Sequence, residues 1–224
     1  MGAFGTFFGL SFSALLPLIN PLGSALVFLG LVGAAPSSLY RELARRIAIN
    51  TTLFLIVIEA TGTALLKFFG ISLPVMQLAG GLVLAAIGWN TLNQKEVDPD
   101  DAANTRQALG DAAAASLESK AFYPLTFPIT AGPGCIVVMV TLSAHASAKS
   151  VVFDVSAHAG IALAVAVLSG AVYVCYGYAP AITRRVKAQT VQGIVRVIAF
   201  VLLCIGVQIA WNGAEVLLKS LLKT

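Results

Sequence analysis

Two stretches rich in proline and glycine interrupt long apolar segments, and they hold the groups best placed to bind a small molecule. Leu16–Gly23 lies inside the uncharged segment 4–33, and Pro128–Gly134 lies inside the segment 121–145. A proline within a helix removes one backbone donor, and its ring collides with the carbonyl four residues earlier. The residue before a proline is also pushed out of helical geometry. We therefore predict that a helix breaks at each stretch.

A broken helix offers binding groups of both polarities. The last carbonyls before the break and the first amides after it have no partner within the helix. The amide end carries partial positive charge and suits a carboxylate, whereas the carbonyl end suits a cation, so a zwitterion fits between them. The amides expected there belong to Leu22, Gly23, Ser24, Ala25, Gly134, Cys135, Ile136 and Val137, and the carbonyls to residues around Leu18, Ile19, Ile129 and Thr130.

Small residues around both breaks limit the size of a substrate. Polar side chains are added by Asn20, Ser24, Thr126 and Thr130. We predict a substrate site formed by Asn20, Pro21, Leu22, Gly23, Ser24, Thr130, Ala131, Gly132, Gly134 and Cys135, with Pro17, Pro21, Pro128 and Pro133 as hinges. The alternative is that these residues serve only packing, since proline and glycine are common in membrane helices, whose neighbours can satisfy the backbone.

Glu59 is the only acidic residue deep within an apolar segment. It lies about 18 Å along the helix from Ile47, at 1.5 Å per residue, which predicts a position near the middle of the membrane. Acids in membranes are costly and often functional. Glu59 could couple transport to protons or meet the ammonium group of a substrate; equally, it could be a protonated acid that bonds neighbouring helices. Asp154 and His158, one helical turn apart, are expected to form a local pair.

The composition identifies the elements that position these residues as membrane helices. Of 224 residues, 58% are hydrophobic and 11% are charged, whereas a soluble domain has about 25% charged residues. Six apolar segments have the roughly 20 residues that a membrane-spanning helix needs. They cover 4–33, 47–69, 72–92, 121–145, 151–178 and 191–218, and the polar segment 93–120 is predicted to be a cytoplasmic loop.

The chain divides into two similar three-span halves, residues 1–92 and 121–224. Pro17 corresponds to Pro128, Gly23 to Gly134, Gly62 to Gly170 and Gly88 to Gly206. Because three spans are an odd number, the second half must enter the membrane upside down. We predict an all-α polytopic membrane protein with six transmembrane helices in a 3+3 inverted repeat. Its first and fourth helices are discontinuous, and their breaks face each other.

Basic residues predict the orientation, because lysine and arginine are enriched in cytoplasmic loops. The loops after spans 1, 3 and 5 and the start of span 6 carry Arg41, Arg45, Arg46, Lys95, Arg106, Lys120, Arg184, Arg185, Lys187 and Arg196. The opposite side carries only Lys67, Lys149, Lys219 and Lys223. We therefore expect both termini to be external.

Other classes of function lack their signature residues. Cys135, Cys175 and Cys204 lie singly, without the spacing of metal ligands. The net charge of +4 is too small and scattered for nucleic-acid binding. The sequence has no H-E-x-x-H motif, no paired intramembrane aspartates, no serine–histidine arrangement at a shared depth and no nucleotide-binding loop. We expect no metal, no cofactor and no enzymatic activity.

Several short motifs resemble those of the MarC family. They are Asn20–Gly23, Ala79–Leu82, Ala131–Gly134 and Gln208–Asn212, and the resemblance covers nearly the whole chain. SnatA-like members are transporters of small neutral amino acids such as glycine and alanine, with discontinuous first and fourth helices. The resemblance implies a secondary transporter of this class in a bacterial inner membrane. Its partners would be substrate, membrane lipid and a coupling proton or sodium ion. The alternative is a channel or efflux protein for other small solutes.

Overall fold

The computed structural model describes residues 2–32, 35–93, 121–146, 151–185 and 188–222, which form helices without any strand. In chain order the helices are α1 (Ala3–Ile19), α2 (Pro21–Val32), α3 (Ser37–Phe68), α4 (Leu73–Asn93), the π-helix η3 (Phe122–Thr130), α6 (Pro133–Ala146), α7 (Val151–Gly177), α8 (Ala179–Arg185) and α9 (Ala188–Leu221). The prediction of an all-helical fold is confirmed for this part of the chain.

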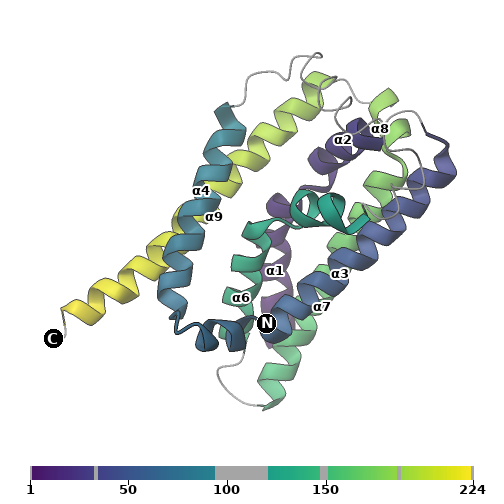
Figure 1. The fold of residues 1–224 in the computed structure, drawn as a ribbon. Coiled ribbons are helices and arrows are strands. Elements are labelled where there is room, and N and C mark those ends of the chain that lie inside the picture. The colour runs from purple at the N-terminus through teal and green to yellow at the C-terminus, as the bar shows by residue number, and fades with distance from the viewer. Residues whose placement is uncertain (1, 33–34, 94–120, 147–150, 186–187, 223–224) are drawn as a thin grey trace.

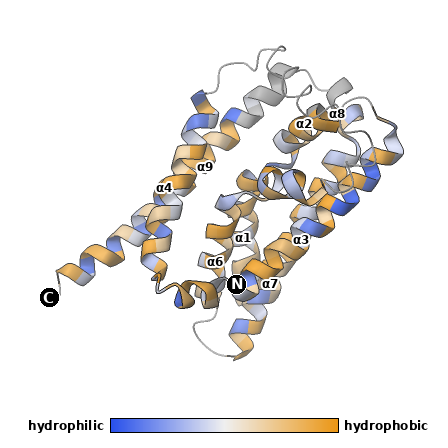
Figure 2. Cartoon of the chain, viewed as in Figure 1, coloured by the Kyte–Doolittle hydropathy of each residue, from blue (hydrophilic) through white to orange (hydrophobic). Residues whose placement is uncertain are grey.

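Most of these helices are long and apolar enough to cross a membrane. Within the described residues, five spans qualify, namely Ala3–Leu29, Ser37–Phe68, Leu73–Asn93, Val151–Gly177 and Arg196–Leu221, and η3 with α6 would make a sixth. Figure 2 shows hydrophobic residues along these helices and hydrophilic ones mainly near their ends. A helix suits this setting because it satisfies its backbone groups internally, without water.

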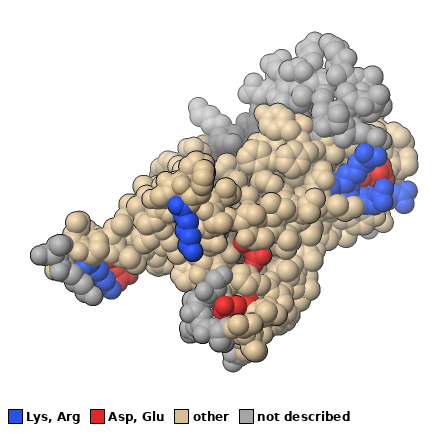
Figure 3. All heavy atoms as spheres, turned by 60° about the horizontal axis from the view of Figure 1, so that its bottom comes forward, with Lys and Arg blue, Asp and Glu red and all other residues tan. Residues whose placement is uncertain are grey.

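The surface is apolar where a soluble protein would be polar. Leu53 is 63% exposed, Phe68 82% and Trp89 59%. Figure 3 shows few charged side chains on a broad uncharged face. A continuous apolar surface of this kind marks contact with another apolar phase, here the lipid bilayer.

Two groups of helices make up the molecule. In Figure 1, α4 and α9 lie together on one side, and α1, α3, α6 and α7 lie together on the other. The most extensive packing is between α4 and α9, followed by α1 with α7, α3 with α7 and α3 with α6. The two interruptions, between α1 and α2 and between η3 and α6, both lie within the second group.

Glycines let α4 and α9 approach with their backbones in contact. A methyl group on Gly88 would lie 2.6 Å from Leu203 N, and one on Gly206 would lie 2.8 Å from Gly81 O. Ordinary contacts of such a carbon begin near 3.4 Å. Gly81, Gly88 and Gly206 therefore allow α4 and α9 to pack closely.

One helix begins earlier than predicted, and one predicted loop lies almost entirely outside the described residues. The second span was expected from residue 47, but α3 already begins at Ser37. Its first turns are polar, and Glu42 there bonds Arg45 at 3.0 Å and Arg46 at 2.9 Å, in the i,i+3 and i,i+4 geometry that supports exposed helices. The predicted loop 93–120 lies outside the described residues from position 94 onward.

Candidate functional site

The first interruption is a single residue. Asn20 has φ 42° and ψ 65°, in the left-handed region that asparagine tolerates better than most residues, and the following Pro21 disfavours helical geometry there. Asn20 N–H nevertheless donates to Leu16 O at 2.9 Å, and Ser24 N–H donates to Asn20 O at 2.9 Å. Helical hydrogen bonds therefore continue across the interruption, and Ala3–Leu29 still qualifies as one span.

Side chains close the backbone groups that this interruption frees. Asn20 Oδ1 accepts the N–H of Gly23 at 3.1 Å, at the amide end of α2. Ser24 Oγ donates to Ile19 O at 2.7 Å, at the carbonyl end of α1. The groups predicted to be open for a substrate are thus held by the very side chains predicted to bind it.

The second interruption is a true bend. Phe127, before Pro128, has the extended values φ −117° and ψ 127° expected at that position. Ala131 also leaves helical geometry, with φ −122° and ψ 85°, although its N–H donates to Thr126 O at 2.8 Å. Together these residues turn the chain by 65° between η3 and α6.

Threonine hydroxyls donate hydrogen bonds to free backbone carbonyls at this second interruption, as a serine hydroxyl does at the first. Thr130 Oγ1 donates to Leu125 O at 2.7 Å, and Thr126 Oγ1 donates to Ala121 O at 2.7 Å. Each hydroxyl reaches a carbonyl five residues earlier, the same distance along the chain as from Ser24 to its acceptor. The two interruptions therefore share one kind of closure.

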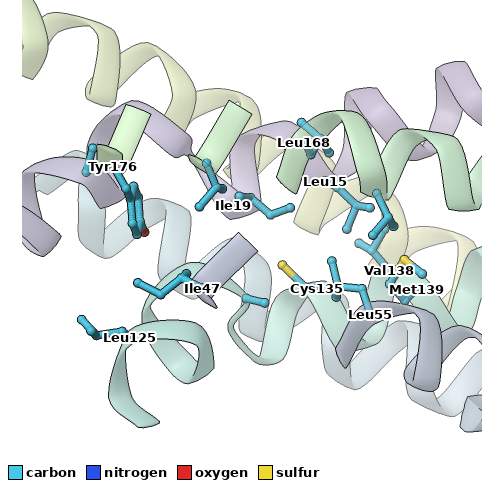
Figure 4. Close-up of a cluster of buried hydrophobic side chains, with 14 of the residues drawn as sticks. Leu15, Ile19, Ile47, Leu55, Leu125, Cys135, Val138, Met139, Leu168 and Tyr176 are labelled. Carbon is cyan, nitrogen blue, oxygen red and sulfur yellow. The ribbon is translucent and has the colours of Figure 1, made fainter. Parts of the chain in front are cut away.

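Tyr176, near the end of α7, connects the two interruptions. Its hydroxyl lies 2.8 Å from Thr130 Oγ1, and its phenol also interacts with the Ser24 side chain. The ring stacks on Phe28 of α2 with centroids 4.6 Å apart. Tyr176 is fully buried and belongs to the cluster of side chains in Figure 4. One phenol thus contacts polar groups from both interrupted segments.

The helix ends at the two interruptions also touch directly. A methyl group on Gly134, at the start of α6, would lie 2.8 Å from Leu18 Cδ2 and closer still to Leu84 Cδ2. Leu18 belongs to the last turn of α1, and Leu84 belongs to α4. Three helices therefore meet at Gly134, where a larger side chain would have to displace the ends of two leucine side chains.

The MarC family model describes integral membrane proteins and matches residues 5–218. The chain belongs to the MarC family. The inner membrane protein MarC of Escherichia coli strain K12 is 31% identical over 214 residues, which are 95% of this chain and 96% of that protein. Proteins of the same name from Shigella flexneri and from Escherichia coli O1:K1 have the same identity and coverage. No solved structure matches the chain.

In this MarC family member, most predicted site residues are buried. Pro21, Ser24, Thr130, Ala131, Gly134 and Cys135 are buried, Asn20, Gly23 and Gly132 are half-buried, and Leu22 is exposed. Of the predicted hinges, Pro17 and Pro21 are buried, whereas Pro128 and Pro133 are exposed. The structure therefore holds these residues in a closed arrangement, and a substrate would have to separate them.

Glu59 lies away from both interruptions. His158 Nδ1 on α7 shares a hydrogen bond with Glu59 Oε1 on α3, and Ser143 Oγ on α6 donates to the backbone oxygen of Glu59 at 2.7 Å. At 1.5 Å per residue, His158 is about 27 Å from Tyr176 along α7. Glu59 therefore does not reach a substrate held at the interruptions, and His158 bonds across to α3 in addition to standing one turn from Asp154.

The described cysteines and acidic residues form no evident metal centre. Within that part of the chain, no three His, Cys, Asp or Glu side chains are placed to hold a metal ion. Cys135, Cys175 and Cys204 are free and lie on α6, α7 and α9.

Sequence reasoning missed Tyr176 and Phe28. An aromatic residue at the end of an apolar segment usually anchors a helix at the membrane interface, so the position of Tyr176 in the sequence does not distinguish it. The available signal was its hydroxyl, because a buried phenol normally finds a hydrogen-bond partner. Which partner it finds depends on how α7 packs against η3, and no local pattern specifies that packing.

Proposed function

We propose that this chain is a secondary transporter of small neutral amino acids, of the glycine and alanine class, in the inner membrane. The observation that carries the proposal is that two interrupted helices from opposite halves meet at Tyr176. Interrupted helices in corresponding positions of two halves are the best pointer to a transporter's binding site. The names of the curated relatives, which are inner membrane proteins, support the location.

The substrate would bind by taking over the bonds that now close the interruptions. Its carboxylate would replace Asn20 Oδ1 at the Gly23 amide, because the start of a helix attracts anions. Its ammonium group would meet the carbonyl and hydroxyl oxygens around Thr130 and Tyr176. The leucine side chains that crowd Gly134 would favour a substrate whose side chain is a hydrogen or a methyl group.

An inverted repeat is supported by the contacts between α4 and α9. A methyl group on Gly88 would meet Leu203 N and Ala199 O, and one on Gly206 would meet Ala85 N and Gly81 O. When the sequence is shifted so that position 88 coincides with 206, position 85 coincides with 203 and position 81 with 199. Exchanging the two halves therefore exchanges one set of contacts for the other, as a two-fold axis between them would require.

Alternating access would move the halves around this fixed site. Pro17, Pro21, Pro128 and Pro133 flank the interruptions, where a pivot disturbs few helical hydrogen bonds. In inverted-repeat transporters, one repeat rocks against the other around a central site. We propose external termini, no enzymatic activity, and a proton or sodium gradient as the driving force.

The test is uptake of labelled glycine and alanine into proteoliposomes, with pH and sodium gradients imposed separately. Uptake driven by one gradient would support the proposal. Proteoliposomes that take up neither amino acid under any gradient, while the protein is folded and inserted, would contradict the substrate class.

Two threonines on η3 provide a matched pair of variants. Thr130→Val and Thr126→Val each remove a hydroxyl that bonds a carbonyl five residues earlier, but only Thr130 contacts Tyr176. A net hydrogen bond contributes about 0.5–1.5 kcal/mol, so Thr130→Val should raise the half-saturation concentration about 2- to 13-fold. The half-saturation concentration of Thr126→Val should stay close to that of the unmodified protein. Equal effects would place the substrate away from Tyr176.

A further inference from the structure

Four hydroxyls with buried oxygen atoms lack the bond that helical serine and threonine usually make. The oxygens of Ser11 on α1, Thr51 on α3, Thr141 on α6 and Ser169 on α7 have no hydrogen-bond partner among the described residues, and Ser11, Thr51 and Ser169 are at most 3% exposed. By contrast, Thr52 donates to Ala48 O at 2.9 Å, and Thr61 donates to Val57 O at 2.7 Å. Buried polar groups without a partner are rare in proteins, and each calls for water, an ion or a ligand.

Thr51 and Ser169 lie at the same height between two helices that pack together. The Glu59–His158 bond aligns α3 with α7 at one end, and a methyl group on Gly177 would lie 3.7 Å from Ala44 Cβ at the other. At 1.5 Å per residue, Thr51 is about 12 Å from Glu59, and Ser169 is about 16 Å from His158. The two free hydroxyls are therefore within about one helical turn of each other along the bundle.

Three polar side chains share one face of α7, with buried apolar residues that include Val165 and Val172 between them. His158, Ser169 and Tyr176 follow each other after eleven and then seven residues. Residues with these spacings lie within about 20° of one another around a helix. The row of these three side chains begins at the hydrogen bond to Glu59 and ends at the hydroxyl that bonds Thr130.

The Glu59 end of this row is tightly closed. Glu59 is linked by hydrogen bonds to His158 on α7 and to Ser143 on α6. Nearby, a methyl group on Gly160 of α7 would lie 3.0 Å from Phe8 N of α1, so these helices also touch. The Glu59 side chain is 10% exposed and that of His158 is 34% exposed, which places the pair at the edge of the buried region.

We propose that a narrow water-filled passage between α3 and α7 connects the Glu59–His158 pair with the interruptions, and that this pair is its gate. Water in a buried passage needs polar partners, and the free hydroxyls of Thr51 and Ser169 supply them partway along the row. Opening the gate would break the hydrogen bond between Glu59 on α3 and His158 on α7. With external termini, this gate faces outward, because Gly160, two residues after His158, packs against the backbone of Phe4 and Phe8 near the start of α1.

Cysteine labelling tests the passage without any amino acid, so its failure is distinct from failure of the proposed transport function. Ser169→Cys is introduced after Cys135, Cys175 and Cys204 are replaced by alanine. Its reaction with a small charged methanethiosulfonate is timed in proteoliposomes, with the reagent added from each side separately. Thiols react as thiolates and therefore need contact with water.

We expect Ser169→Cys to react slowly, and at least tenfold faster when His158→Ala is added to open the gate. Val167→Cys is the control, because Val167 is on the same helix but 45% exposed on its apolar surface. It should stay unreactive in both backgrounds. A second pair on α3 is Thr51→Cys, expected to react once the gate opens, and Thr52→Cys, expected not to.

Glu59→Gln provides an independent way to weaken the gate if His158→Ala fails to fold. If either folded variant speeds the reaction of Ser169→Cys with the methanethiosulfonate reagent, the passage is supported. The proposal is overturned if neither folded variant accelerates Ser169→Cys, or if Val167→Cys accelerates equally.

Discussion

Replacing either of two glycines between α4 and α9 with alanine should destabilise the protein by nearly the same amount. The added methyl group would lie 2.9 Å from Leu203 Cα at Gly88 and 2.9 Å from Ala85 Cα at Gly206, and closer still to the backbone nitrogen of each of these residues. The opposing atoms are backbone, so the helices must separate by several tenths of an ångström or more. Such overpacking costs about 3 kcal/mol at the upper end of its usual range. The better helix propensity of alanine returns about 1 kcal/mol, leaving a net loss of about 2 kcal/mol.

Gly170→Ala is the matched control, because a methyl group there meets nothing within 4 Å. Helix propensity alone should raise the free energy of unfolding of Gly170→Ala by about 1 kcal/mol. This variant should therefore be about 3 kcal/mol more stable than Gly88→Ala or Gly206→Ala. The free energy of unfolding of all three variants is measured by titration with a denaturing detergent. If Gly88→Ala and Gly206→Ala are as stable as Gly170→Ala, the backbones do not meet there. If only one of the two destabilises, the exchange symmetry between the halves is wrong.

Three further predictions concern the interruptions and the orientation. Gly134→Leu should abolish glycine uptake while the protein remains folded in the membrane, and normal uptake would move the site elsewhere. Pro21→Ala and Pro133→Ala should slow turnover more than they weaken binding, as measured by uptake rate and by equilibrium binding; normal turnover in both would rule out hinges. A cysteine replacing Gly2 should react with an impermeant thiol reagent in intact cells, and protection of that cysteine would reverse the predicted topology.

The positions of the interruptions could be predicted because their cause is local. Pro21 disfavours helical geometry at Asn20, and Pro128 does the same at Phe127. The structure has non-helical backbone at both residues. The extent of each interruption was not predictable in the same way. Asn20 keeps its bond to the carbonyl four residues back, so the helix continues, whereas Ala131 bonds five residues back and the chain bends.

The hydrogen bonds made by the freed backbone groups were also not predicted from the sequence. Asn20, Ser24 and Thr130 were singled out as polar groups beside the interruptions and were predicted to bind a substrate directly. In the structure each one bonds the backbone of its own interruption. Serine, threonine and asparagine commonly bond nearby backbone in this way, and a binding site and a closed site can therefore share one sequence.

Contacts between distant helices were the least predictable part. Tyr176 reaches Thr130, and His158 reaches Glu59, across helices whose pairing no periodicity in the sequence specifies. Glu59 was expected near the middle of the membrane because its depth was counted from Ile47 along one helix. Its partner His158 lies near the beginning of α7 and was expected only to pair with Asp154 on the same helix. Only the packing of α3 against α7 shows that the two residues meet.

The closure of both interruptions by side chains has a consequence for affinity under the proposed function. A substrate would exchange partners with Asn20 and Thr130 rather than fill empty positions, so each new bond returns only its net value of about 0.5–1.5 kcal/mol. When the substrate leaves, the hydroxyl and amide groups can close again, so no buried backbone group is left unpaired. A carrier must release its substrate on the far side of the membrane as readily as it binds on the near side. Self-closing interruptions fit that requirement better than a permanently open site, because they keep the empty and loaded states close in free energy.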